Sequence, residues 1–468
     1  MPTLDYILSM RSKNRTRRSF LTLIILLGFW SCSDDDQGYT PLNINTVADQ
    51  AEVFQNAVLT LDILENDTNV PIDGQILLDA PSKGTASITQ HNNLGEARLT
   101  YTPNPGAIGE DRFIYSVCDE LGNQCSNALI TINILPVTPV TLDLSLVPYP
   151  KLSDYNFFDG PMAQQEPAYG VLPYEPISVL FTDYAHKKRF VWMPEGSSAS
   201  YVSDDVLLNF PTGAVLIKTF FYDNVLPDLT TQIIETRLLI KKEDGWLFAD
   251  YIWDAEQQEA FLDVEGYGAN VPIEWVENGQ TNFVNYRIPS NSQCYTCHKS
   301  YQEEMPIGPK PQNLNGLFNY TDGAENQLQK WADVGYLESG FPSQINTVVD
   351  WSDETQDLET RVRSYFDINC ASCHSDSGHC DYRALRMNFS SSADLANIGV
   401  CVNPDTPIPG YENAKIIEPG NAQGSVLFFR LHTTDEEYRM PLLGRSLRHE
   451  ESLEFIEQWI QNLTTVCD

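Results

Sequence analysis

The chain has 468 residues, of which 42% are hydrophobic and 11% aromatic, so sizeable cores can form and a globally disordered protein is excluded. At roughly 100–200 residues per domain, this length predicts two to four domains. The formal net charge of −35 at pH 7 argues against nucleic acid and anionic lipid as binding partners, and it is compatible with a basic protein partner.

Residues 1–31 have the pattern of an export signal. A basic stretch precedes the apolar run Phe20–Trp30, which is too short to span a bilayer as a mature helix. Ser31-Cys32 follows and resembles a bacterial lipoprotein cleavage site, so we expect Cys32 to be lipidated; an ordinary secretory signal cut nearby is the alternative. The acidic run after Cys32 resembles the surface-export signal of Bacteroidetes lipoproteins. We therefore expect an outer-membrane lipoprotein, exposed at the cell surface or facing the periplasm, that is held to the membrane by lipid alone.

Residues 32–45 are polar and are expected to form a tether. From 46 to 136, short runs of alternating polar and apolar residues are separated by turn residues, which predicts strands. The strings Asp62–Thr68 and Asp111–Asp119 resemble those of cadherin-like, Ig-like repeats in bacterial surface proteins. This resemblance covers the whole segment and implies an Ig-like β-sandwich.

Two further features belong to this segment. Cys118 and Cys125 flank a turn-rich insert between two expected strands, which favours a hairpin disulfide in an exported chain. Asn66, Asp67 and Asp119 are candidate calcium ligands, as in some relatives, although carboxylates in turns are more often only solvated.

A central β-rich domain is expected over residues 143–290. The proline-containing stretch Pro136–Val140 suits a short, stiff linker before it. Runs such as Ala214–Phe221 and Trp246–Trp253 are rich in apolar, β-branched and aromatic residues, which favour strands. The sequence contains no Gly-rich phosphate loop, G-x-S-x-G or H-E-x-x-H motif, and we assign no catalytic residue.

Two C-x-x-C-H motifs follow, and this is the attachment motif of c-type haem. Two thiols at this spacing can bond to the two vinyl groups of haem, and the adjacent His can then bind the iron. A zinc site would need further Cys or His at ligand spacing, and a thiol oxidoreductase would need a βαβ context; neither is evident. We therefore expect two covalently bound haems c, the first on Cys294, Cys297 and His298 and the second on Cys370, Cys373 and His374.

Apolar residues at helical spacing occur both before and after the second motif in the sequence. Leu358–Phe366 and Leu453–Leu463 each place their large apolar side chains on one helical face. A helix that leads into the motif and a second helix at the C-terminus predict an α-helical, cytochrome c-type haem domain over 355–468. We expect a first haem module over 291–345.

The second haem has a clear candidate for its opposite iron ligand. Met440-Pro441 lies shortly before the C-terminal helix, where a cytochrome c domain places its distal Met. A thioether ligand stabilises ferrous iron and raises the reduction potential. Met387 is the competitor and is better suited to filling the core.

The first haem has three candidates for the same position. Met305 lies soon after His298 and ranks slightly ahead of Met193, which precedes the motif by a long stretch of chain; His186 is the third. An iron without a second protein ligand is the remaining alternative, and such an iron can react with a substrate.

Three further Cys lie in the C-terminal part. Cys380 and Cys401 are expected to form a disulfide that braces the loop after the second motif. Cys467 is then unpaired or pairs with one of them, because connectivity does not follow from sequence.

Several strings keep their order and spacing across both motifs, among them Phe181–Ala185, Arg189–Pro194, Glu235–Leu239, Ile307–Lys310, Met440-Pro441 and Trp459-Ile460. Together they resemble a family of bacterial dihaem c-type cytochromes over roughly 143–468. The resemblance implies the cofactor and the fold of this part. It supplies no substrate.

Three functions are compatible with these features. The favoured one is electron transfer between redox proteins, with both irons six-coordinate. The second is a dihaem oxidoreductase, for example peroxidase-like, in which the second haem feeds electrons to an open first haem. The third is a surface-binding protein with secondary haems, which the Ig-like segment suggests.

Overall fold

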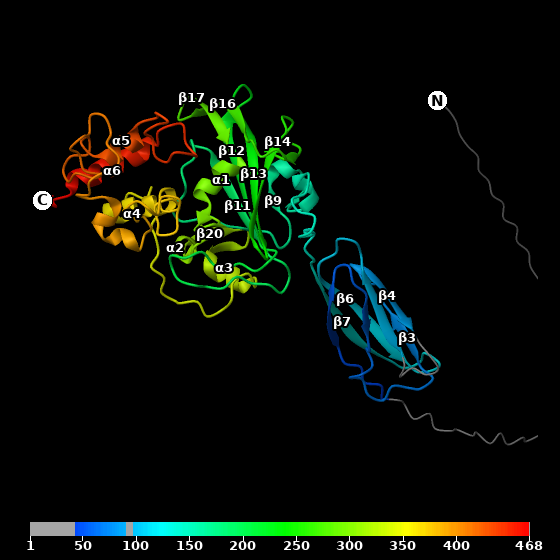
Figure 1. The fold of residues 1–468 in the computed structure, drawn as a ribbon. Coiled ribbons are helices and arrows are strands. Elements are labelled where there is room, and N and C mark those ends of the chain that lie inside the picture. Colours follow the sequence, from blue (N-terminus) through cyan, green and yellow to red (C-terminus); the bar gives the residue numbers. More distant parts are fainter. Residues whose placement is uncertain (1–42, 90–96, 468) are drawn as a thin grey trace, which may run out of the picture. The chain divides into compact units, whose positions relative to one another are not determined.

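The computed structural model describes residues 43–89 and 97–467, and the chain divides between Leu135 and Pro136 into two compact units. The expected signal peptide, Cys32 and nearly all of the tether lie outside the described residues. Strands outweigh helices, so the protein is a mostly β, multidomain chain (Figure 1). In the part that the structure describes, every helix is too short or too polar to cross a bilayer.

The first unit is a sandwich of two sheets, with strand orders β1-β7-β6-β3 and β2-β5-β4. Phe113, Tyr115 and Val117 alternate along one strand and point into a core that they share with Leu99 and Tyr101 of the other sheet. The strands are β1 (Asp49–Phe54), β2 (Leu59–Leu61), β3 (Gln75–Leu78), β4 (Gly84–Thr89), β5 (Arg98–Pro103), β6 (Gly109–Cys118) and β7 (Cys125–Leu135).

The polar residues of this unit hold its turns and strand ends. Asp67 accepts hydrogen bonds from the Tyr115 hydroxyl at 3.0 Å and from a backbone N–H, and Asn66 donates to Asp49 at 3.1 Å. Asp119 accepts from a backbone N–H in the β6–β7 turn. The three candidate calcium ligands therefore contact protein groups in this structure. The disulfide suggested between Cys118 and Cys125 joins the ends of β6 and β7.

The second unit is built on one large antiparallel sheet of order β10-β11-β12-β13-β14-β15, extended by β16 and β17. Its strands are β10 (Leu172–Pro173), β11 (His186–Trp192), β12 (Val215–Val225), β13 (Thr230–Lys242), β14 (Gly245–Trp253), β15 (Ala260–Leu262), β16 (Ala269–Glu277) and β17 (Gln280–Ile288). Short pairs lie outside it, namely β8 (Phe158–Asp159) with β9 (Glu166–Pro167), β18 (Lys299–Ser300) with β19 (Glu303–Glu304), and β20 (Leu317–Tyr320) with β21 (Gly323–Asn326).

Both faces of this sheet are covered, which explains why its strands read as nearly continuous apolar runs. Ile217 on one face packs in a cluster with Tyr155 from the segment before the sheet. Leu216 on the other face packs in a cluster with Trp331 from a helix after it. The aromatic and β-branched residues of the expected β-rich domain thus fill two separate cores.

The helices of the second unit follow the sheet in sequence. They are α1 (Asn291–Cys297), α2 (Pro311–Leu314), α3 (Gln327–Asp333), α4 (Leu358–Asn369), α5 (Val426–His432) and α6 (Glu450–Asn462), with the 3₁₀ turns η2 (Leu152–Tyr155), η3 (Met162–Gln164), η4 (Ser391–Ala393) and η5 (Leu395–Ile398). Figure 1 shows α4, α5 and α6, coloured yellow to red, gathered on one side of the green sheet. Their shared core contains Phe366, Leu431 and Trp459. The segments expected at 143–290, 291–345 and 355–468 all lie within this unit.

One expected disulfide is wrong. Cys401 is bonded to Cys467, with a Cα–Cα distance of 5.2 Å, and Cys380 is unpaired. The chain after α6 returns to Cys401, whereas the Cys380 N–H donates to the Cys373 carbonyl at 2.9 Å and keeps Cys380 beside the second motif.

Removing each disulfide by paired Cys→Ser substitution is expected to have unequal effects. The Cys401–Cys467 bond closes a loop with a sequence separation of 66, so its loss lowers the free energy of unfolding by about 4 kcal/mol. The Cys118–Cys125 bond spans a separation of 7, and its loss costs about 2 kcal/mol. Chemical denaturation with separate probes for the two units measures both values. Equal losses in the free energy of unfolding would contradict the interpretation that each disulfide stabilises its unit by restricting the unfolded chain.

Candidate functional site

The first C-x-x-C-H motif occupies a short, well-capped helix. Ser290 accepts from the Gln293 N–H, and the Gln293 side chain accepts from the Ser290 N–H at 2.9 Å, which is a capping box at the start of α1. The helix ends at Cys297, and the His298 N–H donates to the Cys294 carbonyl. Both thiols of the motif are unpaired.

The His298 imidazole is held in a defined orientation against the sheet. Its ring packs on Phe248 of β14 with centroids 5.1 Å apart, and its Nδ1 lies 3.0 Å from the Met305 carbonyl oxygen. Burial, reinforced by the charges of Lys218 and Arg237, lowers the pKa of His298 to about 3. The ring is therefore neutral, and a proton on Nδ1 leaves the Nε2 lone pair free to bind a metal.

The second motif begins where α4 ends. Cys370 caps this helix, and both Cys373 and His374 donate their N–H groups to the Cys370 carbonyl. Burial, with the nearby Arg383, Arg386 and Arg430, lowers the pKa of His374 to about 4, so this imidazole is also neutral. Its Nδ1 is buried without a hydrogen-bond partner among the described residues.

A cavity of about 170 Å³ opens beside the second motif. Its wall includes Cys370, Cys373 and His374, and the loop that carries Met440 and Pro441. Leucine, isoleucine and valine side chains supply most of the remaining apolar lining. Two thiols, a neutral imidazole and a thioether therefore share one apolar cavity.

The two motifs lie in direct contact. The Cys373 Sγ is 3.8 Å from the Thr296 carbonyl oxygen, and hydrogen bonding between the Cys297 and Cys373 thiols raises the pKa of Cys297. Thr296 and Cys297 also line the cavity of the second motif. Ser377, just after the second motif, accepts the Tyr301 N–H at 2.7 Å. One cavity thus receives residues from both motifs.

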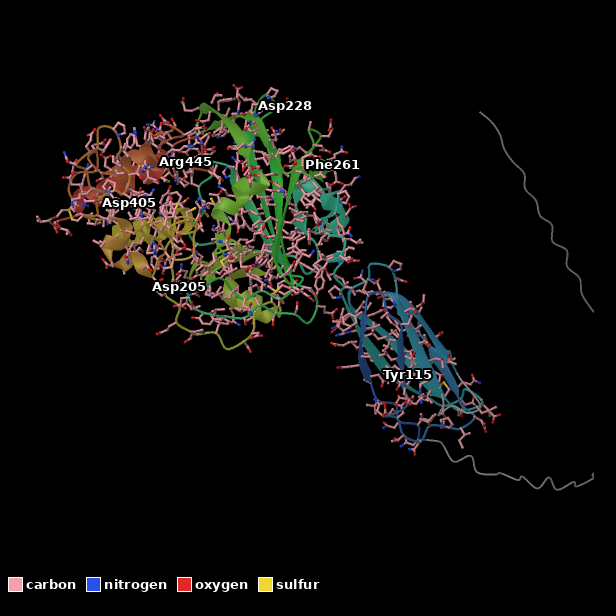
Figure 2. All side chains as sticks on the ribbon, viewed as in Figure 1. Tyr115, Asp205, Asp228, Phe261, Asp405 and Arg445 are labelled. Carbon is pink, nitrogen blue, oxygen red and sulfur yellow. A yellow bond between two sulfur atoms is a disulfide. The ribbon has the colours of Figure 1, made fainter. Side chains whose placement is uncertain are left out.

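The Met440 loop is tied down by one buried guanidinium. Arg445, labelled in Figure 2, is 5% exposed and donates to the Met440 carbonyl at 2.9 Å. It also donates to the carbonyls of Arg430, Thr433 and Leu447. The Met440 N–H in turn donates to the Arg430 carbonyl at 2.9 Å. These bonds hold Met440 against α5.

Asp183 links the same loop to the sheet region. Its buried carboxylate accepts from the Ser446 N–H at 2.7 Å and from the Leu447 N–H at 2.8 Å. The backbone of Asp183 has a φ of +48°, an uncommon conformation for a non-glycine residue. The position of Met440 therefore depends on residues from both ends of the second unit. Neither Asp183 nor Arg445 is predicted from the sequence as a site residue, although Asp183 lies within a string that carries the family resemblance.

Charged residues lie on the sheet beneath the first motif. Arg237 bonds the buried Glu235 through two nitrogens at 2.5 and 2.9 Å, and Tyr286 donates to Glu235 at 2.7 Å. Burial alone would raise the pKa of Glu235, but Arg237 outweighs it and lowers that pKa. Burial and repulsion from Glu235 hold the pKa of Asp250 well above its usual value.

The candidate opposite ligands are placed very differently. Met440 lines the cavity, and Met387 is buried in the core of the helices and also reaches the cavity wall. The Met305 backbone carbonyl oxygen lies 3.0 Å from His298 Nδ1, on the side of the ring away from Nε2. Met305 therefore lies beside the first motif, and its role as the opposite ligand stays a prediction. Met193 is buried in the sheet core. His186 lies on the sheet face that carries Phe221, opposite to His298.

The residues of the second site fit a covalently attached haem. The site combines free thiols at C-x-x-C spacing, a neutral imidazole and an apolar cavity with a thioether on its wall. The first motif has the same thiols and a neutral imidazole, without a placed thioether. Across residues 43–89 and 97–467, no group of three or more His, Cys, Asp or Glu residues is arranged to hold a metal ion.

Comparison with known proteins informs only the first unit. A model of the bacterial Ig domain matches residues 41–133, so this part is a bacterial Ig domain. No curated protein matches the chain significantly.

Two solved structures show weak similarity. The 2,6-sialyltransferase of Photobacterium sp. JT-ISH-224, in complex with CMP and lactose, is 13% identical over 20% of this chain and 20% of that chain, with a TM-score of 0.15. An endo-fucoidan hydrolase of glycoside hydrolase family 107 is 13% identical over 52% of this chain and 28% of its own, with a TM-score of 0.17. The chain spans at most 28% of these proteins' lengths, and such TM-scores do not establish a common fold.

Replacing Arg445 by Met is expected to loosen the Met440 loop. Four carbonyls lose a charged donor, so we expect a loss of about 3 kcal/mol in the free energy of unfolding and faster amide exchange over residues 433–447. Denaturation and hydrogen-exchange mass spectrometry measure the two effects.

The matched control is Arg448→Met, because Arg448 forms an exposed ion pair with Glu450 at 2.8 Å. That substitution is expected to change stability by less than about 1 kcal/mol. If both variants behaved alike, Arg445 would not be the residue that holds the loop.

Proposed function

We propose that the chain is an extracytoplasmic dihaem c-type cytochrome that transfers electrons between redox proteins. The observation that carries this proposal is the single apolar cavity that receives the Cys370–His374 motif, Met440 and part of the first motif. Packing in a core or solvation at a surface does not explain why two neutral imidazoles each directly follow a pair of free cysteines at C-x-x-C spacing.

The residues would act by attachment and orientation. Cys294 and Cys297 would bind the first haem, and Cys370 and Cys373 the second. His298 and His374 present neutral rings, and Met440 presents a thioether held by Arg445. Each bound haem would supply one-electron chemistry between ferric and ferrous iron.

The contact between the motifs supports transfer between the two haems. Thr296 and Cys297 touch the loop of Cys373 through sulfur contacts. Groups attached at these cysteines would lie close to each other, which suits the exchange of electrons within the chain.

Location and partner follow from the sequence. We propose lipid attachment at Cys32, which would place the protein at the outer membrane, facing the cell surface or the periplasm. The net charge of −35 favours a basic redox partner through complementary charge. The bacterial Ig domain would lie between the anchor and the haem-binding unit in sequence.

A second candidate function is a dihaem oxidoreductase with an open first haem. It is favoured by the Met305 backbone carbonyl at His298 Nδ1, on the side of the ring away from Nε2, where an opposite ligand would not bind. In this case the second haem would feed electrons to a substrate at the first.

Haem content tests the proposal directly. The full-length protein, produced in a host with c-type haem maturation, is expected to carry two haems per chain by mass spectrometry and pyridine haemochrome spectra. Removal of both thiols of one motif, Cys294→Ala with Cys297→Ala or Cys370→Ala with Cys373→Ala, should lose one covalent haem, whereas Cys380→Ala, which removes a free thiol outside the motifs, should keep both. A wild-type chain without haem would refute the proposal.

Carbon monoxide binding to the reduced protein tests Met440. Met440→Ala is expected to add one CO-binding haem per chain, because the thioether no longer occupies that position. Met387→Leu, a nearly isosteric core substitution, should add none. The number of CO molecules bound per wild-type chain separates the two candidate functions. None is expected for electron transfer alone, and one is expected for the oxidoreductase. If Met440→Ala bound no additional CO, Met440 would not be a ligand of the second haem.

A further inference from the structure

Two guanidinium groups stand in the wall of the apolar cavity at the second motif. Arg383 follows the motif in the chain, and Arg430 lies in the last turn of α5. Both residues are partly buried, and His374 lines the same cavity. The cavity that receives the motif and Met440 therefore also receives two positive charges from separate segments.

Only one of these cations has a carboxylate partner. Arg383 Nη1 lies 3.2 Å from the carboxylate of Asp405, which is the one acidic residue of the cavity wall among the described residues. Across residues 43–89 and 97–467, Arg430 forms no ion pair. Burial and repulsion from Arg383 lower the pKa of Arg430. The wall thus carries one positive charge that no carboxylate of the protein balances.

Most of the hydrogen-bonding capacity of Arg430 is also unused. A guanidinium has five N–H donors, and here Nη1 donates to the Tyr438 carbonyl at 3.0 Å. The other donors have no acceptor in the part of the chain that the structure describes. The backbone of Arg430 is fixed, because its carbonyl accepts from Met440 and Arg445. A fixed guanidinium with free donors is suited to bind an oxyanion.

The neighbouring arginines differ from Arg430 in this respect. Arg386 bonds Asp376 and three backbone carbonyls, and Arg445 donates to four carbonyls. Arg439 is paired with Glu436 at 3.3 Å. The contacts of these arginines account for their charge or their donors by holding loops, whereas the single carbonyl contact of Arg430 does not.

The cavity identifies the class of oxyanion. A haem attached at Cys370 and Cys373 would bring two propionate carboxylates to this cavity. A carboxylate near an apolar wall is costly unless a cation pairs with it, and Arg430 is the wall cation without such a partner. Resting on the proposed function, we propose that Arg430 binds a propionate carboxylate of the second haem.

Arg430→Gln in the two-haem protein tests the assignment, because it removes the charge and keeps an N–H donor for the Tyr438 carbonyl. Reduction makes a haem more negative by one charge, so a nearby cation stabilises the reduced state. The variant is therefore expected to lower the reduction equilibrium constant of the second haem about tenfold, which is 59 mV for one electron. The first haem should be unchanged.

Spectroelectrochemistry measures both potentials, and the chain with Cys294→Ala and Cys297→Ala identifies the second haem because it lacks the first. The propionate bending bands in resonance Raman spectra should shift in Arg430→Gln, which a role limited to holding Tyr438 would not cause. Arg430→Lys keeps the charge, so it should restore most of the potential. If Arg430→Gln does not fold, Arg430→Lys should still shift the Raman bands, because an ammonium replaces the planar guanidinium.

Arg448→Gln is the matched control, because Arg448 forms an exposed ion pair with Glu450 and lies outside the cavity wall. It should leave both potentials and the Raman bands unchanged. Two attached haems with unmoved potentials and unmoved bands in Arg430→Gln, or equal shifts in the control, would overturn the assignment. Absence of haem from the wild type would instead refute the proposed function.

A free oxyanion could satisfy the same chemistry at Arg430. Inorganic phosphate titrated into the wild-type protein is therefore expected to leave the spectrum of the second haem unchanged. A saturable change that Arg430→Gln abolishes would show that Arg430 binds a free anion, and the propionate assignment would be wrong.

Discussion

The second site depends on the hydrogen bonds of one buried guanidinium. The segment between α5 and α6 has no regular secondary structure, so its buried carbonyls have no helix or strand to satisfy them. Arg445 donates to three of them and to the Arg430 carbonyl in α5, and Asp183 accepts two N–H groups of the same segment. Through these two residues the loop of Met440 is fixed both to α5 and to the sheet region. A loop without such partners could not hold a thioether in the cavity wall.

The sheet serves the first motif in a different way. Its strands bury apolar side chains on both faces, yet one face also carries Arg189, Lys218, Arg237 and Asp250 in adjacent strands. Of these, Arg189 and Asp250 are buried, and buried charge is costly for stability and is a common mark of functional sites. Because His298 packs on the same face, Lys218 and Arg237 act on its imidazole and help to lower its pKa. The sheet thus provides both a support and an electrostatic environment.

The two motifs are unequal although their sequences are alike. The second combines its thiols and imidazole with Met440 across an apolar cavity. The first has the same local chemistry, but the Met305 backbone carbonyl lies at His298 Nδ1, on the side of the ring away from Nε2. A six-coordinate second iron and a less constrained first iron would explain why electron transfer and an oxidoreductase reaction both fit this chain. The contact between the motifs serves either function.

Local patterns in the sequence were sufficient for the features that short stretches of chain determine. They include the strand-rich first unit, the Cys118–Cys125 pair across one hairpin, the helices α4 and α6, and the C-x-x-C-H motifs from which haem is proposed. Periodicity and short spacing suffice there because the interacting residues are neighbours in the chain. The tertiary structure alone decided that Cys467 pairs with Cys401, that the Met305 carbonyl lies at His298 Nδ1, and that Arg445 holds the loop of Met440. These arrangements depend on spatial distances between residues that are far apart in the chain. Spacing along the sequence carries no information about such distances.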